Sequence, residues 1–180
     1  MFRLFYKFSF VYLMAVLTVP TVLANEFDIA NTFGANSTNI GIAAITVNTV
    51  TGTIENQTVN LNNSDAIFQN EVIETKANST TQFMFLDETI LTVGPESRLV
   101  LDEIFFDPNA TEGKLVLSAM KGLFSFVSGS LPSESYEVKT PTATIGVRGT
   151  RFNLYVARNG ASTVVLKSGA VDVKNLRGVT

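Results

Sequence analysis

The 180-residue sequence contains no cysteine and no histidine. Without cysteine no disulfide can form, so packing and strand pairing alone must stabilise the fold. Without histidine there is no Ser-His or Cys-His pair, no imidazole ligand for zinc, and no side chain that titrates near neutral pH unless a carboxylate is strongly perturbed. These absences exclude most hydrolase mechanisms. We therefore expect a protein that is not an enzyme and uses no metal or cofactor.

The apolar run at the N-terminus has the features of a secretory signal. Arg3 and Lys7 supply positive charge, Phe8–Val19 forms an apolar core, and Val22–Ala24 is a small-residue cleavage site. We expect this signal peptide, residues 1–24, to be removed. The alternative is an uncleaved membrane anchor, although the apolar run is shorter than the roughly 20 residues that span a bilayer.

Removal of the signal takes away 24 of the 180 residues and two of the 13 basic ones, which leaves 156 residues with 11 basic against 16 acidic. This acidic balance argues against non-specific nucleic-acid binding. Residues 25–39 are rich in Asn, Ala, Ser and Thr and are expected to form a flexible leader. Residues 40–180 are long enough for one core, so we expect one domain there. The composition near Thr180 leaves open a continuation of the chain.

The chain after the leader consists of short runs rich in Val, Ile, Thr and Phe, bounded by Gly, Asn, Asp or Pro, which is typical of strands. No window shows a helical apolar stripe. The sequence therefore predicts an all-β domain of short bent strands, built either as a β-roll or solenoid-like stack or as a two-sheet sandwich. The predicted strands are Ile40–Glu55, Ala66–Thr75, Thr80–Leu86, Thr89–Val93, Arg98–Phe106, Lys114–Met120 and Leu123–Val127.

Alternation along these runs predicts which side chains are buried. Thr81, Phe83 and Phe85 share one face of their strand. Arg98–Phe106 is apolar on both sides near its middle, as in a strand that is covered on both faces or turns at a corner. The expected core is Phe83, Phe85, Leu99, Leu101, Phe124, Phe126, Ile145, Val147, Phe152, Val164 and Leu166.

A weak repeat occurs in the second half of the chain. Gly129, Gly149 and Gly169 lie 20 residues apart between β-branched or apolar flanks. This spacing fits a coil of a β-solenoid, a hairpin pair in a meander, or unrelated turns, and three glycines do not decide between them.

Thr140–Phe152, with the sequence TPTATIGVRGTRF, is the most informative stretch because no generic strand or turn rule requires that order. Pro141 fixes its φ angle and should begin an edge or corner strand, while Gly146 and Gly149 allow backbone conformations closed to other residues. Their spacing predicts a bulge or sharp bend that sets the direction of Arg148.

Two interpretations of Arg148 remain open. Its planar guanidinium can bind a carboxylate, a phosphate or the backbone of a partner through two parallel hydrogen bonds. Alternatively, Arg148 pairs inside the domain with Asp87 or Glu137, or stacks on Phe152. The adjacent acidic pairs, Asp87–Glu88 and Asp102–Glu103, are expected to be solvated turn residues rather than a catalytic pair. Residues 107–113 are expected to form a plain loop rather than a Ca²⁺ site.

Three ordered blocks carry a family resemblance: Phe85–Asp102, Lys121–Gly129 and Thr140–Phe152. Together they resemble FecR-like periplasmic domains over about residues 40–174. Glu88 departs from the glycine usual there, and Arg151 stands where an acidic or small polar residue is common. On the resemblance, the loop expected to contact a partner or to act structurally comprises Thr144, Gly146, Arg148, Gly149, Thr150 and Arg151.

In the regulators that name this family, a cytoplasmic segment binds a sigma factor and the periplasmic domain receives a signal from an outer-membrane transporter. Only seven residues precede the apolar stretch here, too few for a sigma-binding module. We therefore expect a secreted periplasmic binding or scaffold domain that engages an envelope protein or cell-wall component. The alternative is a membrane-anchored signalling domain that reports on a transporter.

Overall fold

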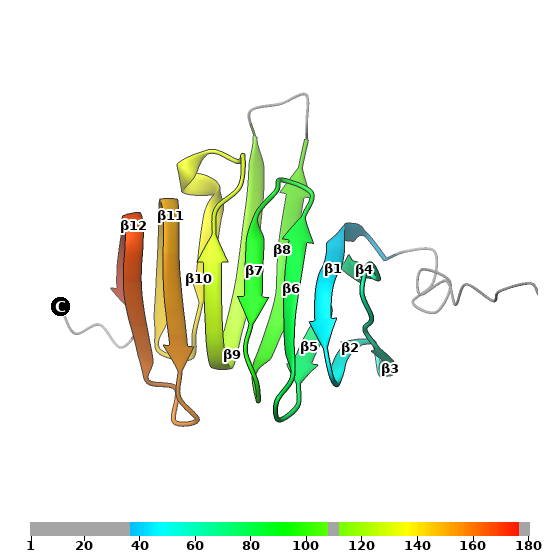
Figure 1. Ribbon diagram of the computed structural model, residues 1–180. Helices are drawn as coiled ribbons and strands as arrows, with labels where there is room; N and C mark the ends of the chain where they lie inside the picture. Colours follow the sequence, from blue (N-terminus) through cyan, green and yellow to red (C-terminus); the bar gives the residue numbers. More distant parts are fainter. Residues whose placement is uncertain (1–36, 108–111, 177–180) are drawn as a thin grey trace, which may run out of the picture.

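The computed structural model describes residues 37–107 and 112–176 (Figure 1). The expected signal peptide and nearly all of the expected leader lie outside these residues. The described chain is all-β, as predicted, and its one helical element is the 3-10 turn η1, Ser133–Ser135. The strands are β1 Asn39–Val47, β2 Val50–Ile54, β3 Gln57–Asn60, β4 Ala66–Phe68, β5 Val72–Thr75, β6 Thr80–Phe85, β7 Ile90–Val93, β8 Arg98–Phe106, β9 Gly113–Val127, β10 Tyr136–Lys139, β11 Ala143–Val156 and β12 Ser162–Asn175.

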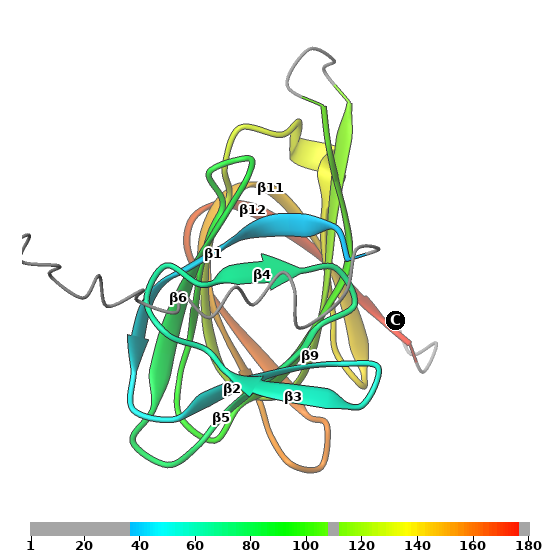
Figure 2. The ribbon, with the colours of Figure 1, turned by 90° about the vertical axis from the view of Figure 1, so that its right-hand side faces the viewer.

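All these strands belong to one 12-stranded sheet. The main path runs β3-β2-β5-β8-β9-β7-β6-β1-β4, and β10, β11 and β12 join it through β9. Every pairing is antiparallel except that of β9 with β10. The sheet curls around its own apolar face (Figure 2). The all-β prediction is confirmed; where the sequence predicted a β-roll or solenoid-like stack or a two-sheet sandwich, the twelve strands form one curled sheet.

The long strand β9 makes the sheet turn. Its first part, Gly113–Lys121, pairs with β8 and in part with β10, and its last part, Gly122–Val127, pairs with β11 and in part with β7. The register with β8 shifts near the junction of these parts, opposite Arg98 and Leu99. Such an irregularity bends a strand and increases its twist. The two runs predicted as separate strands are thus one strand that changes neighbours at its bend.

Asparagine turns divide two other predicted runs. Asn48, with φ of 62°, separates β1 from β2, and Asn70, with φ of 65°, lies between β4 and β5. Asparagine tolerates this left-handed region better than most residues because its short amide can bond locally. The strands β3, β10 and β12 were not among the predicted runs. Of the two alternatives given for Arg98–Phe106, the structure has the corner, because a register shift between Leu101 and Glu103 brings Ile104 to the buried face.

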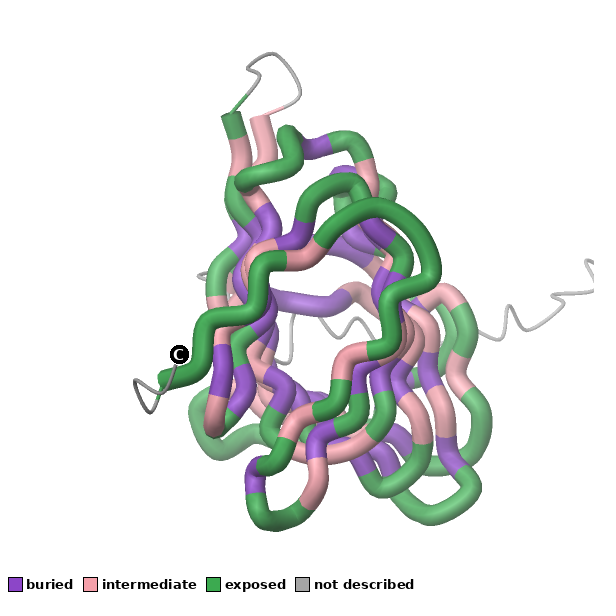
Figure 3. Tube along the Cα trace, turned by 90° about the vertical axis from the view of Figure 1, so that its left-hand side faces the viewer, coloured by how far each residue is buried: buried purple, intermediate pink, exposed green. Residues whose placement is uncertain are grey.

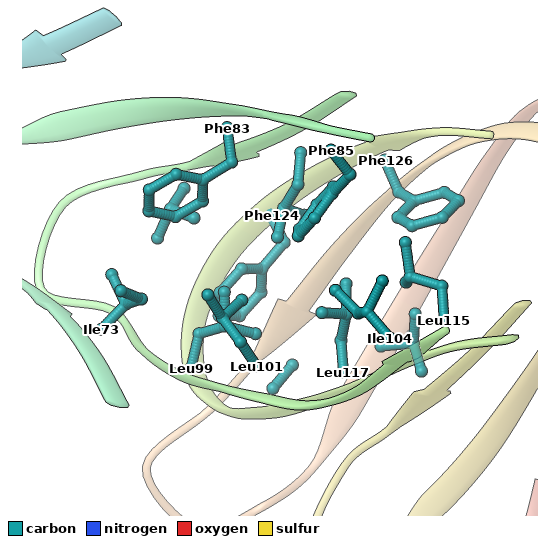
Figure 4. Packing of buried hydrophobic residues seen from close by; sticks show 14 of the residues in the cluster. Ile73, Phe83, Phe85, Leu99, Leu101, Ile104, Leu115, Leu117, Phe124 and Phe126 are labelled. Atoms are coloured by element: carbon teal, nitrogen blue, oxygen red, sulfur yellow. The ribbon is translucent and has the colours of Figure 1, made fainter. Parts of the chain in front are cut away.

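The core fills the concave side of the sheet, where Phe83, Phe85, Phe124 and Phe126 face leucines of β8 and β9 (Figure 4). Nine of the eleven predicted core residues are buried. Val164 is only partly buried, and Leu166 is 44% exposed, so the prediction for Leu166 is wrong. Both lie on β12, which pairs only with β11 and ends the sheet. No second described strand lies beside β12 to cover them.

Candidate functional site

The signature stretch begins as a turn and becomes the strand β11. The Thr140 hydroxyl accepts hydrogen bonds from the Ala143 amide, at 3.0 Å, and the Ser162 hydroxyl, at 2.9 Å. Pro141 thus lies in the turn between β10 and β11 rather than at the start of a strand. The Thr-Pro-Thr part of the signature fixes how β11 enters the sheet.

The predicted bulge is present in β11. The register with β12 shifts between Arg148 and Arg151, and Gly149 adopts a φ of 56°. Gly146 has no positive φ, and its prediction as a conformationally special glycine is wrong. Of the two glycines in this motif, Gly149 is therefore the one that needs a left-handed backbone conformation.

Buried Thr150 holds the bulge in place. Its amide donates to the Ser128 hydroxyl at 2.9 Å, and its carbonyl accepts from the Ser128 amide at 3.0 Å. Its hydroxyl also donates to the Ala170 carbonyl on β12 at 3.4 Å. The bulge is thereby tied to both neighbouring strands, which gives the residues beside Thr150 a fixed position.

The two arginines of the bulge point to solvent. Arg148 and Arg151 are exposed, and neither side chain forms an ion pair or hydrogen bond with any residue in 37–107 or 112–176. The internal partners considered for Arg148 are engaged elsewhere: Asp87 with Tyr136, and Glu137 with Lys139 at 3.6 Å. The interpretation of Arg148 as an internally paired residue is therefore wrong.

Of the six candidate residues, four lie together at the bulge: Arg148, Gly149, Thr150 and Arg151. Thr144 and Gly146 precede it on the same strand, where they pair with Lys174 and Asp172 of β12. Gly169 sits on β12 opposite the bulge, where a Cβ atom would overlap the Gly149 carbonyl. The 20-residue spacing of Gly149 and Gly169 thus reflects an antiparallel hairpin and not a solenoid coil.

Asp87 contradicts its prediction as a solvated turn residue. It is 2% exposed, and its carboxylate accepts hydrogen bonds from the Thr89 hydroxyl at 2.6 Å and the Tyr136 hydroxyl at 2.8 Å. The Tyr136 oxygen in turn accepts from the Leu131 amide at 2.9 Å. The pKa of Tyr136 is raised to about 12, mainly by burial and secondly by the hydrogen bond to Asp87. This network connects residues 87–89 with residues 131–136.

The turn at residues 87–89 also forms hydrogen bonds with the end of the second signature block, residues 121–129, and with Ser130 after it. The Gly129 amide donates to the Thr89 hydroxyl at 3.0 Å, and the Ser130 amide donates to the Asp87 carbonyl at 2.7 Å. Glu88, which departs from the family glycine, adopts a φ of 67°. A left-handed conformation explains why glycine suits that position. The motifs at residues 85–102 and 121–129 therefore pack together as structural elements.

Sequence reasoning missed the buried carboxylate of Glu71, which has 0% exposure. One oxygen accepts from the Phe68 amide at 2.9 Å, and the other has no hydrogen-bond partner. Burial raises its pKa to about 7, the nearby Asp65 charge adds to this, and the bond from Phe68 opposes it. Nothing in the local sequence marks this glutamate, since a turn before a strand ordinarily exposes its acidic residue.

The described residues bring no three potential ligands of the Asp, Glu, His or Cys type together for a metal ion. The other acidic pair is engaged locally: Asp102 accepts from Ser118, and Glu103 pairs with Lys114 at 2.8 Å. The loop weighed as a Ca²⁺ site falls partly outside the described residues. A cleft of about 170 Å³ lies between Glu96, Lys121, Tyr155 and Arg158, which is smaller than a typical ligand pocket.

Comparison with known proteins agrees with this arrangement of motifs. The family described as FecR protein matches residues 71–172, more than half of the chain. No curated protein and no solved structure matches. Within the described residues, no helix has the length and apolar character needed to cross a membrane. The match begins at the buried Glu71, includes the Asp87 network and the arginine bulge, and ends on β12, so the chain belongs to the FecR family, whose domains are associated with periplasmic signalling.

Proposed function

We propose that this chain is a secreted, non-catalytic binding or scaffold domain of the bacterial periplasm, which engages an envelope protein or cell-wall component. The observation that supports this most directly is the pair of exposed arginines, Arg148 and Arg151, on a bulge anchored by buried Thr150. The anchored bulge fixes where the two side chains leave the backbone, and their planar guanidinium groups suit carboxylate or phosphate groups. Such groups are presented both by envelope proteins and by cell-wall peptides.

A capture experiment with a stability control tests this proposal. Wild-type mature protein, Arg148→Ala and Arg151→Ala are immobilised and exposed to a periplasmic extract, after thermal unfolding of each has been measured. We expect unchanged melting temperatures and weaker capture of the same partner by both variants. Arg98→Ala is the matched control, because Arg98 already pairs with Glu74 at 2.6 Å on another part of the sheet. Full capture by both bulge variants would contradict the proposed role.

A second measurement separates the secreted form from an anchored signalling domain. The mass of the exported protein gives its N-terminus. We expect Asn25 as the first residue, which would exclude the anchored form. Retention of residues 1–24 in the membrane fraction would instead favour a domain that reports on an outer-membrane transporter.

A further inference from the structure

The strand β12 leaves a long edge of the sheet unpaired. It runs over 14 residues, Ser162–Asn175, pairs with β11 on one side, and has no strand on the other side among the described residues. Figure 3 views the molecule from this end, where β12 is largely exposed. An open edge presents alternate amide and carbonyl groups that can pair with another strand. Proteins usually shorten or cover such edges, and this one is long.

The apolar inner face of the sheet continues onto β12 without being covered. Leu166 lies opposite buried Phe152, and Val173 lies opposite buried Ile145. Yet Leu166 is 44% and Val173 50% exposed. One more strand beside β12, with apolar side chains at alternate positions, would cover both. These exposed apolar side chains therefore favour an incoming strand with apolar residues at every second position.

The charge of the β11–β12 hairpin indicates what the remaining side chains of the incoming strand should be. Residues 143–175 carry five basic residues and one acidic residue, whereas the whole chain has 13 basic and 16 acidic ones. Four of the basic residues are exposed on β11 and β12: Arg148, Arg151, Lys167 and Lys174. Among the described residues, Lys174 alone of these four forms an ion pair, with Asp172 at 3.9 Å. A basic hairpin on an acidic protein favours a negatively charged partner.

We propose that β12 accepts an extended segment of a partner protein as a thirteenth strand, with acidic side chains alternating with apolar ones. This inference rests on the proposed binding function and names the chemistry of the partner. The apolar residues cover Leu166 and Val173, the acidic residues face the basic side chains, and the backbone pairs with the open edge. A second copy fits less well, because it would bring another basic hairpin against the first and oppose like charges.

Binding of a defined peptide tests the inference. The probe is a fluorescein-labelled, capped ten-residue peptide in which Glu alternates with Val, and its Lys-Val counterpart is the control. We expect saturable binding of the Glu-Val peptide to the mature protein by anisotropy, weakened by salt, and no binding of the Lys-Val peptide. Hydrogen–deuterium exchange should slow in β12 amides only when the Glu-Val peptide is added.

Variants identify the surface. The double variant Lys167→Glu/Lys174→Glu should weaken binding about tenfold or more, and Leu166→Asn should weaken it several-fold. Lys76→Glu, a charge reversal at an exposed position between β5 and β6, should leave binding unchanged. Each of these side chains is exposed, so the variants should fold.

Any of four results would overturn the inference. One is equal binding of the Lys-Val peptide, and another is peptide binding without protection of β12. The third is protection of β12 before any peptide is added, through a dimer or through the segment at residues 25–36, which size measurement and deletion of that segment distinguish. If the peptide fails while capture still depends on Arg148, only the strand-addition inference is lost. The proposed function would then stand.

Discussion

Glu71 and Gly52 fit together in the core: the buried carboxylate of Glu71 occupies the space that a side chain at position 52 would need. Gly52 lies on the buried face of β2, and a Cβ there would overlap the Glu71 Oε1 atom and come within 2.8 Å of its Cδ. The glutamate cannot move aside without giving up its bond to the Phe68 amide. The glycine is therefore required by packing and not by its backbone angle.

Gly52→Ala should lower the free energy of unfolding by about 1 to 3 kcal/mol, because overpacking forces the glutamate out of place. Urea denaturation of Gly52→Ala, Glu71→Ala and the double variant checks this. The second substitution should cost much less once Glu71 has been shortened, which gives a coupling energy. Strictly additive effects would show that the two residues do not compete for the same space.

Glu71→Gln should change how stability depends on pH. Because the folded pKa is about 7, above its usual 4.5, the folded state holds the proton more tightly than the unfolded state, so wild-type stability falls as pH rises between these values. The loss is on the order of 3 kcal/mol if the carboxylate ionises in place. Denaturation at pH 5, 6, 7 and 8 should show this fall in wild type and in the control Glu74→Gln, whose carboxylate lies partly exposed in an ion pair with Arg98. The fall should be absent in Glu71→Gln. Parallel profiles of stability against pH for all three proteins would show that Glu71 does not cause the fall.

Tyr136→Phe should cost about 1 to 3 kcal/mol, since it leaves the Asp87 carboxylate and the Leu131 amide each one hydrogen bond short in a buried site. The ring itself keeps its edge-on contact with Phe126, at 5.9 Å between centroids. Tyr155→Phe is the matched control because Tyr155 is 52% exposed. Equal melting temperatures for the two variants would argue against a stabilising network.

Phe126→Ala should lower stability by about 3 to 5 kcal/mol, as expected for a buried aromatic residue. Phe126 is 1% exposed and packs against both Tyr136 and Phe152. Phe105→Ala provides the comparison, because Phe105 is 55% exposed. Calorimetry of both variants checks the assignment, and a melting point for Phe126→Ala within a degree of wild type would contradict it.

Three glycines of the β11–β12 hairpin should respond differently to alanine. Gly149→Ala strains a φ of 56° and should cost about 1 to 2 kcal/mol, although open space surrounds the position. Gly169→Ala should cost more, because it combines a φ of 82° with overlap on the Gly149 carbonyl. Gly146→Ala is the control, with nearest atoms at 3.8 Å and no positive φ. Thermal unfolding in any other order would contradict this account of the bulge.

Local pattern alone predicted the all-β class, the position of β8 and most of the core. Thr81, Phe83 and Phe85 are buried while Met84 is exposed, as their alternation indicated. Side chains on successive residues of a strand point to opposite faces, so two-residue periodicity survives in any all-β arrangement. The left-handed Gly149 was also predictable, because its backbone requirement depends on a few neighbouring residues.

The tertiary structure decided which strands end the sheet and which polar residues it buries. Leu166 has the same local pattern as a core residue, but β12 has one neighbour and leaves it exposed. From the local sequence Asp87 resembles a solvated turn carboxylate, but in the fold it accepts a hydrogen bond from Tyr136, 49 residues later. Arg148 could not be separated from Asp87 or Glu137 by sequence because their distance depends on strand order. Strand order arises from pairing between remote segments, and local periodicity carries no information about it.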